Sequence, residues 1–202
     1  MKIALFEQGS IGTNCYIVYD ESEKQAFCVD CSDKISNAYF DFIEKNALQI
    51  KYLLLTHGHY DHAADILAFT RRFPKTQVVI SQTDYENIRQ RKSVFCESDA
   101  FPEPSMLVND GDILPFLNSS IKIIATPGHT SGSVCYLFGD ALFCGDTVFD
   151  GSIGRTDMAT GSFFEIMKSV AKIASLGDYA LYPGHMSTTD ITTQKEMNPY
   201  FR

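Results

Sequence analysis

Four side chains of the types that bind metal ions fall within six consecutive residues, His57-Gly58-His59-Tyr60-Asp61-His62. The segment follows the apolar run 52–55, which predicts a buried strand. In an extended segment His57 and His59 project to the same side, and the glycine between them leaves room for a tight bend. These two histidines can therefore bind one ion. Asp61 and His62 lie at the start of a predicted helix, so they leave the chain in another direction and can bind a second ion.

Three further candidate ligands each follow a predicted strand much later in the chain: His129, Asp146 and His185. Strand ends on one rim of a sheet converge in space, so these side chains can meet those of the first segment. Together they make seven ligands, which is enough for two ions. The alternative is a polar surface loop rich in histidine. The count argues against it, because the chain has five histidines in all and the other two also lie in Gly-His loops.

The chemistry expected from two such ions is hydrolysis. One zinc ion lowers the pKa of bound water to about 7, and a second ion that shares this water favours hydroxide further. Neutral pH would then supply a nucleophile without a serine or a cysteine, while one ion polarises a carbonyl oxygen. Esters, thioesters, lactones and amides all fit this chemistry. Imidazole and carboxylate ligands suit zinc, and they suit iron and manganese as well.

The predicted elements place these ligands in an α/β fold. Short β-branched and aromatic runs at 2–7, 14–20 and 25–30 predict an antiparallel meander at a sheet edge. Apolar residues at helical spacing over 35–47 predict a helix that covers the sheet. The patterns further along predict strands at 50–56, 76–80, 121–125 and 179–182, a hairpin of 133–138 with 141–144, and helices over 63–73, 82–90, 161–175 and after 188.

Residues 92–118 are the least regular part of the sequence and contain three prolines. A long segment of this kind is often a lid or a pocket wall, and here it offers Phe95, Phe101 and Met106. A simple surface connection is the alternative.

Length and composition suit one domain over residues 1–202. The chain is 45% hydrophobic and 21% charged, and no apolar run is long enough for a membrane span. The first residues lack the apolar core and cleavage site of a signal peptide, which predicts a cytoplasmic protein. A net charge of -8 without any basic run argues against nucleic acid as a partner. The oligomeric state is left open.

Six cysteines are present, and Cys28 and Cys31 are separated by two residues. Such a pair can be a redox or a zinc motif, but no second pair and no trailing helix pattern accompany it. We interpret Cys28 as a buried strand residue and Cys31 as a turn residue. Free thiols suit a reducing compartment.

The first ligand segment, followed in order by His129, Asp146 and His185, resembles the metallo-β-lactamase superfamily over nearly the whole chain. The resemblance implies a four-layered αββα sandwich of two mixed sheets flanked by helices, with two divalent metal ions at one end. It also implies a first metal held by His57, His59 and His129, a second held by Asp61, His62 and His185, and a bridge formed by Asp146. Asp61 and Asp146 would be the catalytic carboxylates. The β-lactamases of this superfamily do not use aspartate at the Asp146 position, so hydrolysis of these antibiotics is not expected.

Within the superfamily, residues 126–132, 145–147 and 183–185 are similar to glyoxalase II, which hydrolyses the thioester lactoylglutathione. The motif 154–157 resembles one in short bacterial relatives, where Arg155 would bind an anionic part of the substrate. A structural pair of Arg155 with Asp157 is the alternative. Two departures affect the thiol carrier. Met186-Ser187 stands where the family has a tyrosine, and the chain ends at Arg202, before the C-terminal helical domain that helps bind glutathione.

We therefore predict a dinuclear metal hydrolase that cleaves a small thioester or ester, with glyoxalase II activity as the leading case. A persulfide dioxygenase with a single iron is the second hypothesis, because those relatives share the first ligand segment. A non-catalytic metal-binding module is the third. The predicted partner is a small-molecule substrate, with no role for nucleic acid or a membrane.

Overall fold

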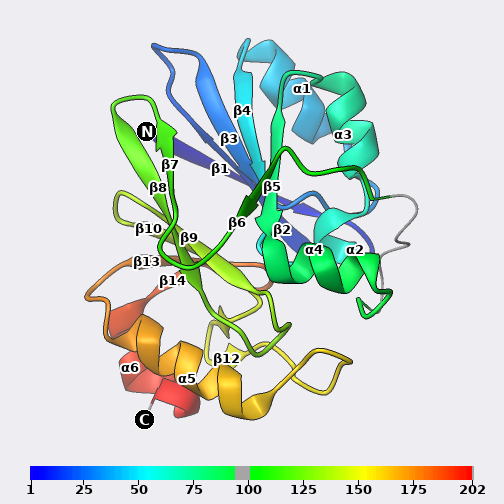
Figure 1. Cartoon of the computed structure of the whole chain (residues 1–202). Coiled ribbons are helices and arrows are strands. Elements are labelled where there is room, and N and C mark those ends of the chain that lie inside the picture. The colour runs from blue at the N-terminus through cyan, green and yellow to red at the C-terminus, as the bar shows by residue number, and fades with distance from the viewer. Residues whose placement is uncertain (94–100, 202) are drawn as a thin grey trace.

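Two β-sheets form the centre of the protein, whose computed structural model describes residues 1–93 and 101–201 (Figure 1). The first sheet has the order β1-β2-β3-β4-β5-β6, with β1 Lys2–Gln8, β2 Thr13–Tyr19, β3 Gln25–Val29, β4 Gln49–Leu54, β5 Gln77–Ser81 and β6 Met106–Val108. Strands β1 to β3 are an antiparallel meander with β1 at the edge, and β3 to β6 run parallel. The predicted meander is confirmed.

The second sheet has the order β14-β13-β10-β9-β8-β7. Its strands are β7 Ile113–Phe116, β8 Ser119–Ala125, β9 Val134–Phe138, β10 Ala141–Gly145, β13 Ala180–Pro183 and β14 Thr189–Asp190. Strands β9 and β10 are the predicted hairpin, and β10 runs parallel to β13. A separate pair is formed by β11 Val148–Phe149 and β12 Ser152–Ile153.

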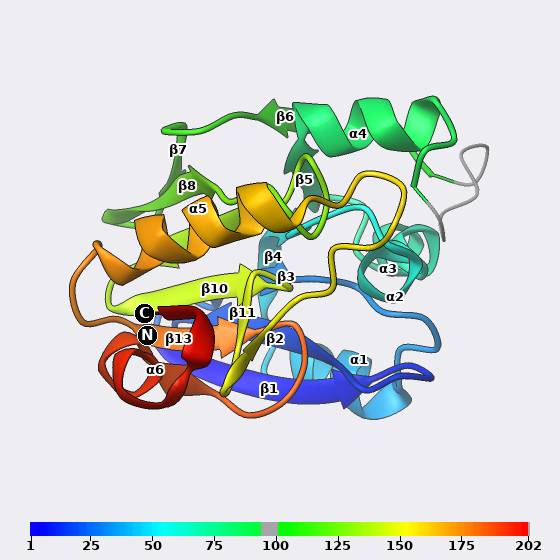
Figure 2. The same cartoon turned by 90° about the horizontal axis from the view of Figure 1, so that it is seen from below.

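Helices cover the outer face of each sheet, which makes the four layers of an αββα sandwich (Figures 1 and 2). The first sheet is covered by α1 Asn37–Lys45, α2 Tyr60–Ala63, α3 Ile66–Arg72 and α4 Gln82–Arg89. The second is covered by α5 Phe163–Ala174 and α6 Ile191–Met197, and a 3-10 turn Pro199–Phe201 follows. The predicted fold class is therefore confirmed.

Strand β2 illustrates how the sequence fills two apolar layers at once. Cys15, Ile17 and Tyr19 point into the core between the first sheet and its helices, while Tyr16 and Val18 point into the core between the sheets. Successive side chains of a strand point to opposite faces, so a strand buried on both sides is apolar at every position. A third core joins the second sheet to α5 and α6.

The prediction of one continuous helix over 63–73 is wrong. The structure has two helices, α2 and α3, that are separated by Ala64 and Asp65. In a continuous helix the His62 carbonyl would accept the amide four residues later. It instead accepts the Cys31 amide at 2.8 Å. The Asp65 side chain accepts the Ile35 amide at 2.8 Å. These contacts come from a distant segment, so the local sequence pattern does not predict them.

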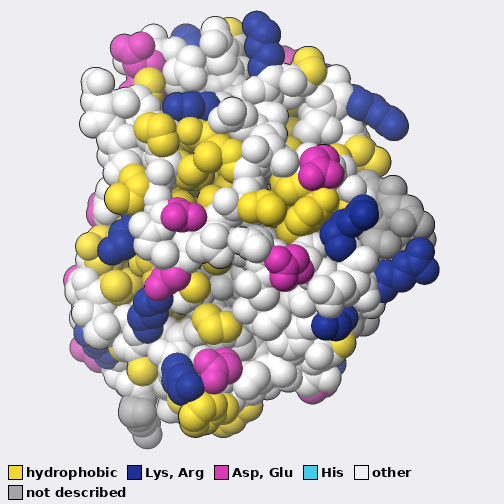
Figure 3. Space-filling model, in the orientation of Figure 1, with side chains coloured by type: hydrophobic (Ala, Val, Ile, Leu, Met, Phe, Trp, Pro, Cys, Tyr) yellow, Lys and Arg dark blue, Asp and Glu magenta, His cyan; other side chains and the backbone are white. Residues whose placement is uncertain are grey.

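Part of segment 92–118 belongs to the sheets. Strands β6 and β7 are the neighbouring edge strands of the two sheets, and Phe101 is buried beside Tyr85. Residues 101–116 are therefore framework, which neither alternative for this segment, a lid or a simple surface connection, had predicted, while Phe95 lies outside the described residues. Apolar side chains gather in the middle of the face that Figure 3 presents, over these edge strands, where Leu107 and Ile113 are exposed.

The surface in Figure 3 carries charges of both signs and shows no histidine. This agrees with the burial of four of the five histidines: His57, His59, His62 and His129. None of the helices in the described ranges has the length and apolar character that crossing a bilayer requires.

Five cysteines lie in the described part of the chain, and all five are free and buried. Burial raises the pKa of Cys28 to about 12 and holds the pKa of Cys31 well above its usual value. Thiols that stay protonated are poor nucleophiles and poor metal ligands. The structure therefore agrees with the interpretation of Cys28 and Cys31 as structural residues.

Phe27 lies at the centre of the core between the sheets, fully buried against Phe116, Phe138 and Phe143. We expect Phe27→Ala to lower the free energy of unfolding by about 3–5 kcal/mol, because it removes a large ring and leaves a cavity. Urea unfolding followed by circular dichroism measures this change. Phe164→Ala is the control, since Phe164 is exposed and its loss should cost less than about 0.5 kcal/mol. A loss below about 1 kcal/mol for Phe27→Ala would contradict this account of the core.

Candidate metal centre

The seven predicted ligand side chains converge at one end of the sandwich. The first ligand segment follows β4, and His129, Asp146 and His185 follow β8, β10 and β13. Strands β8, β10 and β13 run in the same direction, so their carboxyl ends open on one rim. The structure thus brings together residues from positions 57 to 185 of the sequence.

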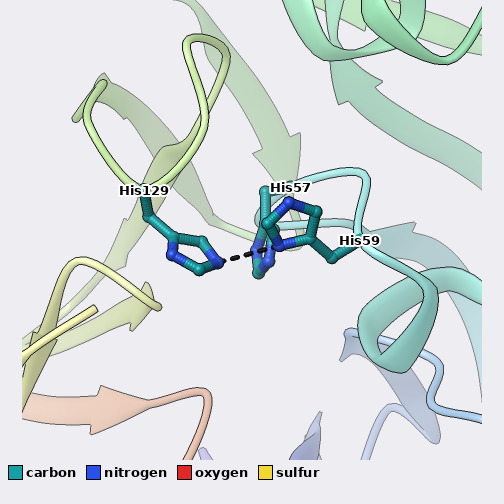
Figure 4. A group of neighbouring side chains, drawn as sticks. All are labelled: His57, His59 and His129. Atoms are coloured by element: carbon teal, nitrogen blue, oxygen red, sulfur yellow. Dashed lines mark hydrogen bonds between the residues drawn. The ribbon is translucent and has the colours of Figure 1, made fainter. Parts of the chain in front are cut away.

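These side chains form three overlapping groups of potential metal ligands. Within each group the ligand atoms lie within 4.8 Å of one another: His57, His59 and His129; His57, His62 and Asp146; Asp61, His62 and His185. Figure 4 shows the imidazoles of the first group pointing toward one another. His57 and His62 each belong to two groups, so the three groups are parts of one continuous centre.

Asp146 lies between the group of His57, His59 and His129 and the group of Asp61, His62 and His185. Its Oδ1 is 3.3 Å from His62 Nε2, and its Oδ2 is 3.4 Å from His129 Nε2 and 3.6 Å from His185 Nε2. Asp61 Oδ2 lies 3.2 Å from His62 Nε2 and 3.1 Å from His185 Nε2. The Asp146 carboxylate therefore faces both ends of the centre, and the Asp61 carboxylate faces one end.

Three buried polar atoms of the centre have no hydrogen-bond partner within the described chain: His57 Nε2, His62 Nε2 and Asp146 Oδ1. Buried polar atoms are nearly always paired, and each unpaired one costs on the order of 1–3 kcal/mol. The same three residues form one of the ligand groups, so bound cations would give all three atoms a partner. The residues present therefore fit a bound metal ion.

Hydrogen bonds on the outer side of two imidazoles determine which nitrogen faces the centre. His129 Nδ1 donates to the Arg155 carbonyl at 2.7 Å, and His185 Nδ1 donates to the Gly12 carbonyl at 3.2 Å. A carbonyl oxygen can only accept, so Nδ1 carries a proton, and in the neutral ring Nε2 then offers its lone pair toward the centre. Outer contacts of this kind orient the histidine ligands of metal sites.

Asp30 was not among the predicted site residues, yet it orients two histidines of the centre. Its Oδ2 accepts His62 Nδ1–H at 2.7 Å and the Thr56 hydroxyl at 2.8 Å, and that hydroxyl oxygen lies 3.1 Å from His57 Nδ1. Asp30 is buried, and its φ of 60° is in the left-handed region that aspartate tolerates. One signal could have identified it: like the predicted ligands, it directly follows a strand.

Asp84 is a second buried carboxylate that the sequence analysis did not single out. Its Oδ2 accepts the Gly58 amide at 2.9 Å and the Thr130 hydroxyl at 2.8 Å, so it ties the first ligand loop to the loop of His129. Burial raises the pKa of Asp84, although the Thr130 and Asn87 hydrogen bonds oppose this. Asp84 lies in the first turn of α4, where acidic residues are common, and no sequence signal distinguishes it.

Burial keeps the imidazoles of His57 and His59 neutral. It lowers the pKa of His59 to about 3, with a further contribution from His129, and it holds the pKa of His57 well below its usual value. Neutral imidazoles offer the lone pair that a metal needs. His59 Nδ1 and His129 Nε2 lie 2.9 Å apart (Figure 4), so the two nitrogens share one proton in a hydrogen bond. A cation between these nitrogens would replace that proton.

The carboxylates of the centre stay ionised. Burial alone would raise the pKa of Asp146, but the surrounding histidines, His62 above all, lower it to about 2. Burial also opposes the ionisation of Asp61, but His62 and His185 hold its pKa well below the usual range. Burial would lower the pKa of His62, yet Asp146, Asp30 and Asp61 hold it well above its usual value. Anionic carboxylates around imidazole nitrogens are ligands that divalent cations prefer.

The backbone of Arg155 lies beside the centre, because its carbonyl accepts a hydrogen bond from His129 Nδ1. Its guanidinium is exposed and forms two hydrogen bonds to Asp157, at 2.7 and 2.8 Å. The side-chain hydrogen bond to Arg155 holds the pKa of Asp157 at about 2. The structure therefore has the pair that was the alternative for Arg155, and a contact of Arg155 with substrate stays a prediction.

The start of β2 holds the loop of His185. The Asn14 amide donates to the Gly184 carbonyl at 2.7 Å, and Asn14 Nδ2 donates to the Pro183 carbonyl at 3.0 Å and the Met186 carbonyl at 2.8 Å. Met186 has a φ of 70°, a left-handed conformation that is rare for a residue with a side chain. The Asn14 contact stabilises this conformation.

Comparison with known proteins establishes the family. The model of the metallo-beta-lactamase superfamily matches residues 9–185, a range that contains all seven candidate ligands. The protein therefore belongs to the metallo-beta-lactamase superfamily. The resemblance deduced from the ligand motifs is confirmed.

Three similar proteins illustrate the range of the superfamily. A hydroxyacylglutathione hydrolase of Francisella philomiragia is 31% identical over 183 residues, and the match covers 89% of this chain and 65% of the length of that relative. The crystal structure of the BLEG-1 B3 metallo-beta-lactamase has a TM-score of 0.88 at 26% identity and covers 99% of both chains. ETHE1 from Myxococcus xanthus has a TM-score of 0.83 at 26% identity, over 98% of this chain and 84% of that one.

Asp30→Asn tests the outer contacts of the centre. The amide keeps the size of the carboxylate but removes its charge, so the His62 ring and, through Thr56, the His57 ring lose an anionic acceptor. We expect zinc affinity, measured by competition with a chelator, to fall about 10–100-fold. Asp33→Asn is the matched control, because Asp33 is also buried but accepts hydrogen bonds from Ser10. Equal zinc affinities of both variants and the unchanged protein would contradict the role of Asp30.

Proposed function

We propose that the protein is a metal-dependent hydrolase that holds two divalent ions and cleaves a small thioester or ester, as glyoxalase II does. The observation that carries the proposal is the position of Asp146, with one oxygen toward His62 and the other toward His129 and His185. A carboxylate between two sets of imidazoles is suited to bridge two cations. The similarity to a hydroxyacylglutathione hydrolase supports a thioester as the substrate.

Under this proposal each ion has its own ligands and one in common. His57, His59 and His129 would hold the first ion, Asp61, His62 and His185 would hold the second, and Asp146 would be shared by both. The bound ions would polarise the substrate carbonyl and activate a water molecule. Zinc suits these ligands, and iron and manganese suit them as well.

The protein's own residues orient the ligands and offset only part of the charge that two divalent ions would bring. Two divalent ions carry four positive charges, and the ionised Asp61 and Asp146 offset two of them, so the site favours an oxyanion. The contacts of Asp30 and Asp84 fix the ligand loops before substrate arrives. Charges fixed in advance stabilise a transition state without the cost of reorganisation.

Arg155 is the candidate to bind an anionic part of the substrate. Its carbonyl contacts His129, so its side chain starts beside the centre, and its guanidinium can bind a carboxylate through two hydrogen bonds. A substrate carboxylate would have to replace Asp157, which occupies both of these positions. We infer that Arg155 contributes to affinity and that it takes no part in bond cleavage.

The similarity to a B3 metallo-beta-lactamase raises the question of β-lactam hydrolysis. The aspartate at position 146 leads us to expect none, because the sequence motif departs at this position from the β-lactamases of the superfamily. We therefore propose thioesters rather than β-lactams as substrates.

Asp146→Ala tests the bridge. Removal of the one carboxylate that faces both ends of the centre should lower kcat/KM for thioester hydrolysis at least about 100-fold, because the ions lose their common ligand. Circular dichroism should be unchanged, and Asp140→Ala, in the exposed turn between β9 and β10, should keep full activity. Turnover by Asp146→Ala at the rate of the unchanged protein would refute the bridge.

ETHE1 from Myxococcus xanthus is the structural relative that favours the second hypothesis, a persulfide dioxygenase with a single iron. An oxygen electrode separates the two reactions. For a hydrolase, we expect the metal-loaded protein to release one thiol per lactoylglutathione or related thioester cleaved and to consume no oxygen. Stoichiometric oxygen uptake with glutathione persulfide, together with no thioester cleavage, would overturn the proposed function in favour of the dioxygenase.

A further inference from the structure

Two of the three candidate ligands of the second ion lie nearer the solvent than the other ligands. The side chains of Asp61 and His185 are 13% and 19% exposed, whereas those of His129 and Asp146 are 3% and 9% exposed. A ligand near the solvent keeps more freedom to move, and ordering it on metal binding costs free energy. The affinity of the second ion therefore depends on the contacts that hold Asp61 and His185 in place before the ion arrives.

Both of these ligands have outer contacts with consecutive residues at the start of β2. The Gly12 carbonyl accepts the His185 Nδ1 proton at 3.2 Å, and the Thr13 hydroxyl donates to Asp61 Oδ2 at 3.4 Å. Thr13 is fully buried. One short segment thus contacts two ligands that are 124 positions apart in the sequence.

Asn14 is the next residue, and it makes three hydrogen bonds to the loop that carries His185. Its amide N–H donates to the Gly184 carbonyl at 2.7 Å, and its Nδ2 donates to the Pro183 carbonyl at 3.0 Å and to the Met186 carbonyl at 2.8 Å. These carbonyls come before and after His185 in the chain. Asn14 therefore fixes the loop on both sides of the ligand.

The position of this loop decides where His185 lies relative to the rest of the centre. The loop packs so closely that a Cβ atom at Gly184 would collide with Asp146 and His62. Met186 has a φ of 70°, a conformation that is unfavourable for a residue with a Cβ atom, and Asn14 binds its carbonyl. Without the Nδ2 donors of Asn14, the loop would be free to relax, and His185 would move with it.

Two ligands of the first ion have outer contacts from other parts of the chain. His57 Nδ1 contacts the Thr56 hydroxyl, which donates to Asp30. His129 Nδ1 donates to the Arg155 carbonyl. These contacts use no residue at the start of β2. A change there should therefore affect the second ion and leave the first ion in place.

We propose that Asn14 is a positioning residue for the second ion, and that the start of β2 sets the affinity of this ion separately from that of the first. The inference rests on the proposed function for the number of ions, and it adds the group that controls one of them. Without the Asn14 side chain, the protein holds the first ion as before and the second ion weakly.

Zinc binding, measured by competition with a chelator, tests this inference. His185→Ala removes a ligand and so identifies the binding step that belongs to the second ion. Asn14→Leu keeps the approximate size of the side chain and removes the Nδ2 donors. It should weaken that step about 10–100-fold and change the other step less than about twofold. Half-maximal thioester hydrolysis should then require about 10–100-fold more free zinc, and saturating zinc should restore the rate.

Asn46→Leu is the control, because Asn46 Nδ2 also donates to a carbonyl, that of Phe42, but at the end of α1. It should change neither binding step. Thr13→Val and Thr13→Ser test the same segment if Asn14→Leu does not fold. Thr13→Val removes the hydroxyl beside Asp61 and should weaken the second ion about 3–10-fold, whereas Thr13→Ser keeps the hydroxyl and the affinity.

Three results would contradict this account, and they can be told apart. Two zinc ions bound with equal affinities by the unchanged protein, Asn14→Leu and Thr13→Val would overturn the inference and leave the proposed function standing. Equal weakening of both binding steps in Asn14→Leu would indicate a general loss of structure and would also overturn the inference. A single zinc ion in the unchanged protein, with no thioester cleaved, would overturn the proposed function and the inference with it.

Discussion

One constraint governs the structure: many imidazole and carboxylate atoms lie close together in a small, largely buried space, and each of them needs a binding partner. The ring centroids of His57 and His62 are 4.1 Å apart, and those of His59 and His129 are 4.6 Å apart. Three ligand atoms lack a hydrogen bond in the described chain, and for two of them, His62 Nε2 and Asp146 Oδ1, the partner is an ion-pair contact of 3.3 Å. Bound cations would give the atoms of this cluster their missing partners.

The fold brings these atoms together through the direction of its strands. Strands β3 and β4 of the first sheet run parallel, as do β10 and β13 of the second, and the polar side chains follow their carboxyl ends. The close approach of the His185 loop to Asp146 and His62 also requires a residue without a side chain at position 184. A Cβ atom there would collide with Asp146 Oδ1 and with the His62 ring. Asp30 accepts a hydrogen bond from the His62 ring, and Asp84 accepts hydrogen bonds from the loops of His57 and His129. The ligands are therefore oriented by contacts within the protein.

Much of this could be predicted from the sequence, because the strong signals are local. Apolar runs and turns predict the strands and most helices, and histidines at the ends of strands predict a common site. The predictions failed where a long-range contact decides the structure. The break between α2 and α3 depends on Cys31 and Ile35, and the role of Asp30 depends on the position of His62. Residues 106–116 join the sheets through pairing with β5 and β8, which irregular composition conceals.

The location of the bound metal tests the central claim most directly. Crystals grown with zinc, measured at wavelengths above and below the zinc absorption edge, would reveal each ion by its anomalous scattering. Our account predicts two peaks, one among His57, His59 and His129 and one among Asp61, His62 and His185, with Asp146 between them. A single peak, or two peaks of which neither contacts Asp146, would contradict it.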